Sequence, residues 1–159
     1  MNLDAKKKLL QHIPSGLYVI CIEAEGKAHA FTASWLSQAS MKPPLLMLGV
    51  RSPSHSLDAL KQCKGFTVNY ISQKEPHIIE HFFKPEKNGQ SRLNDFPHHP
   101  GKTGAPILEN AIGHLECKVK TIVDDIGDHA VIIAEVKDAH LKKDTLPLVM
   151  ADTKWKYGG

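Results

Sequence analysis

Two histidines and a glutamate, His77, Glu80 and His81, have the spacing of the H-x-x-E-H zinc motif. On a helix the two histidines would share a face, and the glutamate would be placed to act as a general base. The motif is short, and surface helices commonly carry histidine and glutamate without binding metal. No third protein ligand is identifiable in the sequence. A zinc hydrolase therefore ranks last among the functions that the sequence permits.

Three other catalytic or nucleotide-binding motifs are excluded. The segment 101–104, Gly-Lys-Thr-Gly, resembles the end of a P-loop, but Phe96 stands where a P-loop has its first glycine. Without that glycine the backbone amides cannot wrap a phosphate. The chain also contains no G-x-S-x-G nucleophile elbow and no G-x-G-x-x-G dinucleotide fingerprint.

The segment 51–56, Arg-Ser-Pro-Ser-His-Ser, precedes a predicted helix over 55–62. Ser54 is a favourable N-cap for that helix. Free amides at a helix N-terminus, hydroxyl groups and a nearby arginine together form an anion site suited to phosphate. An ordinary capped helix beside a surface Arg51 explains the same residues, and the sequence leaves both interpretations open.

A second polar segment, 31–40, lies between two apolar strands and reads Phe-Thr-Ala-Ser-Trp-Leu-Ser-Gln-Ala-Ser. Its hydroxyls and exposed amides are suited to lining the polar edge of a planar ligand. A β-bulge or a solvated sheet edge would have the same composition.

These residues must be positioned by a mainly β structure. The sequence predicts helices over 3–12, 55–62 and 74–83, and strands over 17–22, 28–36, 45–50, 66–71, 114–121, 130–136 and 146–150. Residues 25–27, Glu-Gly-Lys, predict a hairpin turn. Because no βαβα alternation is present, a mostly antiparallel barrel or sandwich with peripheral helices is expected.

Three segments carry more specific expectations. The continuous apolar run 45–50 predicts a strand buried on both faces. The alternation over 114–121 predicts a strand with one wet face, which includes Glu116. Residues 84–106 predict a long loop, and such loops are commonly functional.

Composition limits the remaining classes. The 159 residues are 42% hydrophobic and 23% charged, which predicts a single domain over 1–159 with a real core. A net charge of +3 implies no nucleic acid, and no apolar run approaches the roughly 18 residues of a membrane helix. The first residues lack the apolar core of a signal peptide. Three cysteines without a CxxC predict a reducing, cytoplasmic location.

An ordered set of short segments carries a resemblance to a known family. The segments are 31–35 (Phe-Thr-Ala-Ser-Trp), 43–45 (Pro-Pro-Leu), 54–56 (Ser-His-Ser), 66–69 (Phe-Thr-Val-Asn), 103–108 (Thr-Gly-Ala-Pro-Ile-Leu), 115–117 (Leu-Glu-Cys) and 127–129 (Gly-Asp-His). In this order and spacing, from about residue 12 to the end, the chain resembles the flavin reductase-like, FMN-binding split-barrel family. The sequences of segments 35–40 and 155–159 are similar to those of one branch of the family. Members of that branch occur alone or fused to other flavoprotein modules.

The resemblance implies a six-stranded antiparallel Greek-key split β-barrel that forms a homodimer, with FMN in a groove near the dimer seam. The implied activity is an NAD(P)H:flavin oxidoreductase, in which NADH or NADPH passes a hydride to N5 of the flavin. Reduced flavin would then serve ferric iron or an acceptor protein. The alternative is an FMN electron-transfer protein or ferric reductase without a dedicated NAD(P)H site.

The resemblance also implies a set of site residues. Thr32, Ala33 and Ser34 would contact the isoalloxazine through backbone groups, with Ser37, Gln38 and Ser40 nearby. Ser54 and Ser56 would bind the phosphate, coinciding with the anion site deduced from the helix. The other implied residues are Trp35, which would stack beside the flavin or fill core, Arg51 and Ser52 near the phosphate, and His129. If the two serines do not hold the phosphate, Lys84 and Lys102 of the long loop are the alternative partners.

His129 would orient the nicotinamide or the flavin edge and is the one catalytic residue that the resemblance implies. A histidine at the start of a strand, satisfied by backbone groups, is the alternative.

Overall fold

The computed structural model describes residues 1–86 and 90–159. Residues 87–89, within the predicted loop 84–106, lie outside the described residues. The described part contains three α-helices, α1 (Leu3–Gln11), α2 (His55–Gln62) and α3 (Pro76–His81), and two 3₁₀ helices, Arg92–Asp95 and Met150–Asp152.

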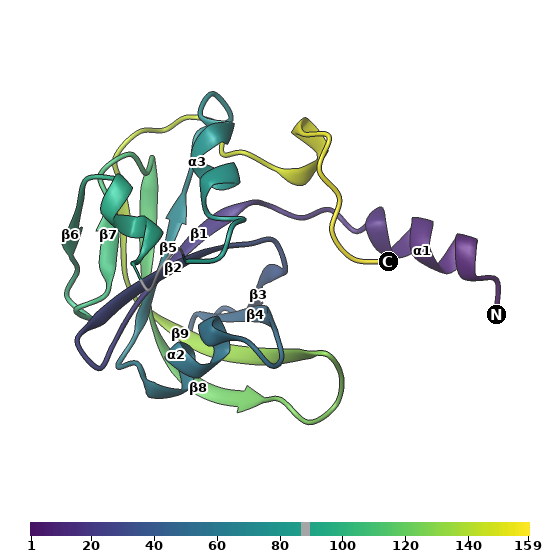
Figure 1. Cartoon of the computed structure of the whole chain (residues 1–159), viewed down its shortest axis with the longest axis horizontal. Helices are drawn as coiled ribbons and strands as arrows, with labels where there is room; N and C mark the ends of the chain where they lie inside the picture. The colour runs from purple at the N-terminus through teal and green to yellow at the C-terminus, as the bar shows by residue number, and fades with distance from the viewer. Residues whose placement is uncertain (87–89) are drawn as a thin grey trace.

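Seven strands form one antiparallel sheet in the order β2-β1-β5-β8-β9-β4-β3. The strands are β1 (Tyr18–Ala24), β2 (Lys27–Ala33), β3 (Leu36–Ser40), β4 (Leu45–Arg51), β5 (Phe66–Tyr70), β8 (Gly113–Val123) and β9 (His129–Leu141). A small second sheet pairs β6 (His98–Pro100) with β7 (Pro106–Leu108). The large sheet is strongly curved (Figure 1). The mainly β, antiparallel prediction is confirmed.

The main sheet has one strand more than the six that the resemblance implies. The segment 28–36, predicted as one strand, is interrupted: β2 ends at Ala33, and β3 begins at Leu36 and continues beyond the predicted strand. β2 pairs with β1, whereas β3 pairs with β4 at the opposite edge of the sheet. The division therefore places Ser34 and Trp35 between strands, where they connect one sheet edge to the other.

The predicted hairpin turn joins β1 to β2. Glu25 and Gly26 both have positive φ, 52° and 77°. Two such residues in a two-residue loop form the turn whose twist matches the flanking strands. The Gly26 N–H also donates to the Glu23 carboxylate at 2.7 Å.

Two apolar clusters form the core, and β1 belongs to both. Ile20 and Ile22 face the larger cluster, which also contains the buried side of α2. Val19 and Cys21 face the second cluster, where α3 packs. Since successive strand residues point to opposite faces, β1 is covered on both sides.

The prediction that 45–50 is buried on both faces is wrong. β4 alternates: Leu46, Leu48 and Val50 are buried, whereas the Met47 side chain is 39% exposed. An apolar residue on the outer face hid this alternation in the sequence. The last predicted strand, 146–150, is also absent as such; isolated bridges, Gly16 to Val149 and Ser72 to Pro147, take its place.

Glu116, expected on the wet face of β8, is only 2% exposed. Its carboxylate accepts the N–H groups of Lys102 and Thr103, at 3.1 and 2.8 Å, and the Thr103 hydroxyl at 2.9 Å. Burial alone would raise the pKa of this carboxyl, but these hydrogen bonds together hold the pKa below its usual value. Glu116 thus fixes the loop before β7.

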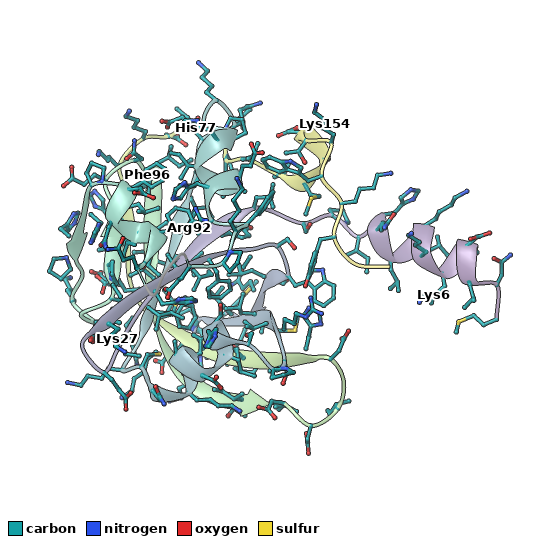
Figure 2. All side chains as sticks on the ribbon, viewed as in Figure 1. Lys6, Lys27, His77, Arg92, Phe96 and Lys154 are labelled. Carbon is teal, nitrogen blue, oxygen red and sulfur yellow. The ribbon has the colours of Figure 1, made fainter. Side chains whose placement is uncertain are left out.

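α1 forms as predicted, capped by the Asn2 side chain, which accepts from the Ala5 N–H. It extends away from the sheet beside the C-terminus (Figure 1), and none of its residues is buried. The Lys6 side chain projects away from the rest of the molecule (Figure 2), whereas the Gln11 side chain contacts the C-terminal segment. The apolar residues Leu3 and Leu9 are each 68% exposed.

Across the described residues, every helix is too short or too polar to cross a membrane.

Candidate functional site

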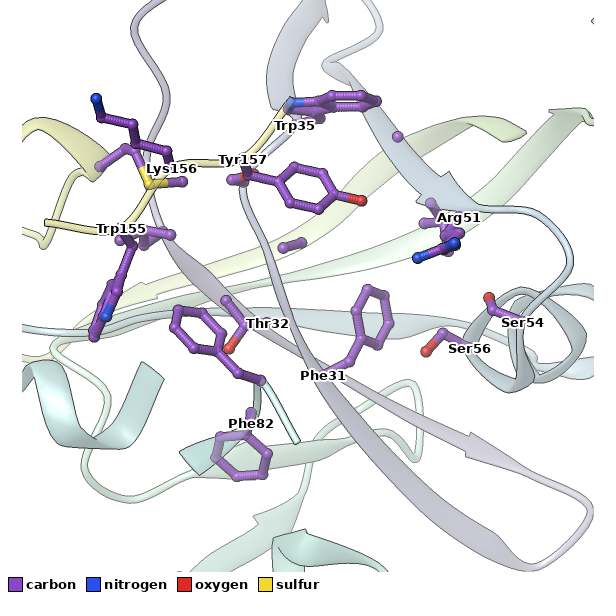
Figure 3. A pocket seen from close by; sticks show the side chains of 17 residues that line it. Phe31, Thr32, Trp35, Arg51, Ser54, Ser56, Phe82, Trp155, Lys156 and Tyr157 are labelled. Atoms are coloured by element: carbon purple, nitrogen blue, oxygen red, sulfur yellow. The ribbon is translucent and has the colours of Figure 1, made fainter. Parts of the chain in front are cut away.

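A cavity of about 530 Å³ lies where the end of β2, the end of β4, the start of α2 and the C-terminal segment meet. That volume is in the range of small-molecule and cofactor sites. Aromatic side chains supply much of its wall: Phe31, Trp35, Phe82, Phe83, Trp155 and Tyr157. One end is polar, with Arg51 above the hydroxyls of Ser54 and Ser56 (Figure 3).

The polar end is built by the corner between β4 and α2. Ser54 is the N-cap of α2, and its hydroxyl oxygen accepts the Leu57 N–H at 3.1 Å. The Ser54 O–H remains available as a donor toward the cavity. The Ser52 N–H donates to the Asp128 carbonyl at 2.9 Å, which ties this corner to the start of β9. The predicted helix N-terminus is confirmed, and it opens into a cavity beside an arginine.

The end of β2 forms another part of the wall. The Thr32 hydroxyl donates to the Ile79 carbonyl at 2.7 Å, and the Thr32 N–H donates to the Phe82 carbonyl at 3.3 Å. The Thr32 side chain therefore anchors α3 to β2. Ala33 and Ser34, which follow it, line the cavity and are nearly buried.

Trp35 belongs to the cavity wall and not to the core. Its indole is partly exposed, and it lies between two glycines, Gly49 of β4 and Gly158. A Cβ added at either glycine would lie 3.0 Å from an indole carbon. The Trp35 carbonyl accepts the Gly49 N–H at 2.8 Å. The two glycines thus allow the backbone to pass close to both sides of the ring.

His129, at the start of β9, is adjacent to this wall but is not among the residues that line the cavity. Its ring lies 4.4 Å from that of Trp35, and its Nε2 lies 2.7 Å from the Tyr157 hydroxyl. Its Nδ1 lies 2.9 Å from Asp128, and this hydrogen bond with His129 lowers the pKa of the Asp128 carboxyl. Burial raises the pKa of Tyr157. His129 therefore holds the C-terminal segment against Trp35.

Five predicted binding residues lie away from the cavity lining. Ser37, Gln38 and Ser40 are on the edge strand β3, where Ser37 and Gln38 are exposed. Ser52 lies in the corner after β4, and Lys84 follows α3 and is exposed. Lys102, the alternative phosphate partner, pairs with Asp138 at 2.6 Å.

The zinc motif has no ligand set in the part of the chain that the structure describes, since no group of three His, Cys, Asp or Glu side chains is placed to hold a metal there. His81 lies 3.0 Å from Asp95 and 3.2 Å from the Arg92 carbonyl. α3 is also shorter than the predicted helix. His81 thus connects α3 to the following 3₁₀ helix.

Sequence reasoning missed several residues of this site. Phe82 and Phe83 follow α3, and Trp155 and Tyr157 belong to the C-terminal segment. The Trp-Lys-Tyr sequence at 155–157 was a visible signal, because two closely spaced aromatic side chains commonly pack against other groups. His29, which lies 2.9 Å from the Ser56 hydroxyl, has no comparable local signal.

Comparisons with known proteins agree with this geometry. Residues 10–159 match the model of the family described as "Flavin reductase like domain". A putative diflavin flavoprotein A 3 from Synechocystis sp. is 31% identical over 90% of this chain, which covers 24% of that protein. The NADPH-flavin oxidoreductase of Streptomyces viridifaciens is 27% identical over 86% of this chain, which covers 72% of it.

Among solved structures, the flavin reductase HpaC complexed with NADP⁺ superimposes with a TM-score of 0.81, at 26% identity and 97% coverage of both chains. The chain spans about a quarter of the length of the diflavin flavoproteins that it matches. The family model nevertheless covers nearly the whole chain. The chain belongs to the flavin reductase-like domain family.

Proposed function

We propose that the protein is an NAD(P)H-dependent flavin reductase that holds FMN in the cavity of about 530 Å³. The observation that carries this proposal is the division of the cavity into an aromatic part and an end with Arg51, Ser54 and Ser56. FMN has the same division, a planar apolar ring system and a phosphate dianion. The residues present therefore fit this group.

The phosphate would be held at the start of α2. The Ser54 and Ser56 hydroxyls donate hydrogen bonds, the Arg51 guanidinium supplies positive charge, and the helix N-terminus adds its partial charge. Ser52 would support the Arg51 corner. Lys84 would add charge from outside, since its neighbour Phe83 lines the cavity and Glu86 contacts His29.

The isoalloxazine would lie along the end of β2 and against the aromatic wall. Because the Thr32 hydroxyl is engaged by Ile79, contacts from Thr32, Ala33 and Ser34 would come from backbone groups. Trp35 would contact the ring system from the side. Ser37, Gln38 and Ser40 face away on β3, so their part in the site requires a second subunit.

Bound FMN would supply the redox chemistry, with its N5 as the acceptor of a hydride from NADH or NADPH. The protein would supply position: the aromatic wall and the phosphate end of the cavity would hold the flavin, and a histidine lies beside the wall. His129, fixed by Asp128 and Tyr157, would orient the nicotinamide or the flavin edge.

Anaerobic mixing tests this activity. The protein loaded with FMN is mixed with NADH and, separately, with NADPH, and the flavin absorbance is followed in a stopped-flow instrument. Rapid bleaching by at least one nicotinamide is expected. Flavin that binds but stays oxidised with both contradicts the reductase.

A second candidate function is favoured by the small share of the diflavin flavoproteins that this chain covers. This chain matches a quarter of those proteins, which carry the domain within a longer chain. The second candidate is therefore an FMN electron-transfer protein or ferric reductase. Such a domain would receive electrons from a neighbouring redox group and would need no NAD(P)H site. The same experiment separates the two, because the electron-transfer protein binds flavin and resists both nicotinamides.

We further propose a single-domain Greek-key split barrel that forms a homodimer and passes electrons to ferric iron or an acceptor protein. The exposed edge strand β3 and the exposed apolar residues of α1 support a partner subunit. The three cysteines are free thiols, which supports a reducing, cytoplasmic location. Light scattering on the purified protein measures the subunit number.

A further inference from the structure

A chain of three polar side chains leads from the polar end of the cavity outward. The Ser56 hydroxyl lines the cavity and lies 2.9 Å from Nε2 of His29. Nδ1 of the same imidazole lies 2.7 Å from a carboxylate oxygen of Glu86. The His29 side chain is 16% exposed and that of Glu86 is 34% exposed, so the imidazole is largely covered while the carboxylate keeps contact with water. β2, α2 and the segment after α3 each contribute one member.

The hydrogen bonds of this chain depend on whether His29 carries one proton or two. A neutral imidazole donates Nδ1–H to Glu86, and its Nε2 then accepts the Ser56 O–H. In that state the Ser56 hydroxyl has no hydrogen for a ligand, and its oxygen lone pairs face the cavity. A phosphate oxygen placed there would be repelled.

The protonated imidazole reverses the bond to Ser56. Both ring nitrogens then donate, one to Glu86 and the other to the Ser56 oxygen. The Ser56 O–H becomes free to point into the cavity and donate to a phosphate oxygen. The imidazolium also adds positive charge close to the anion, and the Glu86 carboxylate stabilises that charge.

We propose that His29 and Glu86 form a proton-linked anchor for the phosphate group, so that phosphate binding at Ser56 takes up one proton from solvent at His29. The proposal rests on the FMN site proposed above and names the positioning residues of its phosphate end. His29 and Glu86 act through Ser56 and do not touch the phosphate themselves.

Other charged and titratable groups lie around this end. β4 contributes Arg51 to the cavity, and α2 carries His55 and Asp58 in its first turn. Across the sheet, the partner of His29 on β1 is Ile22, and the neighbouring ring on β2 is Phe31. Glu86 is the partner within ion-pair distance of His29 among the residues described. These groups are unchanged in a His29 variant, so a comparison with wild type isolates the imidazole.

The test compares FMN with riboflavin, which has the same ring system and no phosphate. Dissociation constants of both are measured by fluorescence from pH 6 to pH 8, within the range of about pH 5 to 8 where histidine titrates. In the wild type the preference for FMN is expected to fall with rising pH, approaching about tenfold per pH unit for one linked proton. Riboflavin affinity is expected to stay flat.

His29→Gln is the decisive variant, because its amide can still donate to Ser56 but cannot titrate. Its preference for FMN should be nearly flat with pH, apart from the second ionisation of the phosphate, which wild type shares. In Glu86→Gln the preference for FMN over riboflavin should begin to fall at a lower pH than in wild type. Glu109→Gln, an equal charge change at an exposed site, should match wild type.

The outcomes separate this proposal from the function it rests on. If neither flavin binds, the flavin site itself is wrong. If FMN binds more tightly than riboflavin but His29→Gln shows the same pH dependence as wild type, the proton-linked anchor is wrong. Unchanged riboflavin affinity in His29→Gln shows that the cavity is intact.

Discussion

Ser54 and Ser56 use their hydroxyl groups differently within the protein, although both line the same end of the cavity. Ser54 accepts from its own helix and keeps its proton for a ligand, whereas Ser56 shares its hydroxyl with His29. The role of Ser54 could be predicted from sequence because a helix cap is a local feature. The role of Ser56 could not, since His29 is 27 residues away and belongs to strand β2, whereas Ser56 belongs to α2.

Replacing both serines with alanine is expected to weaken FMN binding and leave riboflavin binding nearly unchanged. Each lost hydrogen bond to the charged phosphate is worth about 1.5–3 kcal/mol. Loss of the Ser54 cap also lowers the free energy of unfolding by about 1 kcal/mol. Titration calorimetry with both flavins measures the difference. Equal losses for FMN and riboflavin would place the phosphate elsewhere in the cavity.

Glu116 shows a second limit of sequence reasoning at this scale. Its alternation with apolar neighbours predicts a solvated side chain, but the loop amides that bury it come from residues 13 and 14 positions earlier. An alternating pattern shows which face of a strand a residue occupies. It does not show what covers that face.

The lowered pKa of Glu116 predicts a contribution to stability that depends on pH. A carboxyl whose folded pKa lies below its unfolded value stabilises the fold above the unfolded pKa, and this stability is lost as pH falls through the folded pKa. The free energy of unfolding of the wild type, measured with urea, should therefore fall as pH drops below the ordinary glutamate pKa of 4.5. Glu116→Gln should lower stability at neutral pH by about 1–3 kcal/mol. The variant should also lose less free energy of unfolding than wild type on acidification. An equal loss in both proteins would contradict this role of Glu116.

At the scale of elements, the boundary between β2 and β3 decides the shape of the site. Most of the predicted elements form, and α2 has the predicted bounds. The break between β2 and β3 at Ser34 and Trp35 escaped prediction because residues 37–40, most of β3, have a small and polar composition that did not predict a strand. What divides them is pairing with different partners, β1 for β2 and β4 for β3, and pairing is a property of the sheet.

The close approach of β4 to Trp35 makes Gly49 sensitive to substitution. A Cβ at Gly49 would lie 3.0 and 3.1 Å from two atoms of the Trp35 side chain, closer than ordinary contact. Gly49→Val is therefore expected to displace the indole, weaken both FMN and riboflavin binding and change the tryptophan fluorescence. Loss of FMN binding alone would contradict a role for Trp35 in the ring-binding part of the cavity.

The C-terminal segment is the second element that forms the wall. Tyr157 contacts His129, and the Gly158 carbonyl accepts from the Gln11 side chain at 3.0 Å. Ending the chain after Lys156 removes both contacts while leaving the sheet and the Ser54–Ser56 corner. Riboflavin and FMN affinity should fall by the same factor, measured by fluorescence titration. If neither falls, the segment only covers the site.

At the scale of the whole molecule, α1 presents an apolar side to solvent. This side was predicted correctly as a pattern, and it stays largely exposed among the described residues: Leu3 is 68% exposed and Leu10 is 47% exposed. A sequence pattern shows that a face is apolar, and only assembly shows what covers it. The exposed β3 residues, which the family resemblance places near the flavin, are consistent with the second copy proposed above.

Leu3→Glu/Leu10→Glu is expected to shift the proposed homodimer toward monomer. Burial of a large aliphatic side chain is worth about 1.5–3 kcal/mol, so losing two such contacts should raise the dimer dissociation constant at least tenfold. The control is Lys6→Glu/Lys8→Glu, which adds two glutamates on the basic side of the same helix. Light scattering across a dilution series gives the subunit number for each. A wild type that is monomeric throughout would contradict the homodimer. Dimers of equal stability in both variants would place the interface away from α1, with the edge of β3 as the next surface to test.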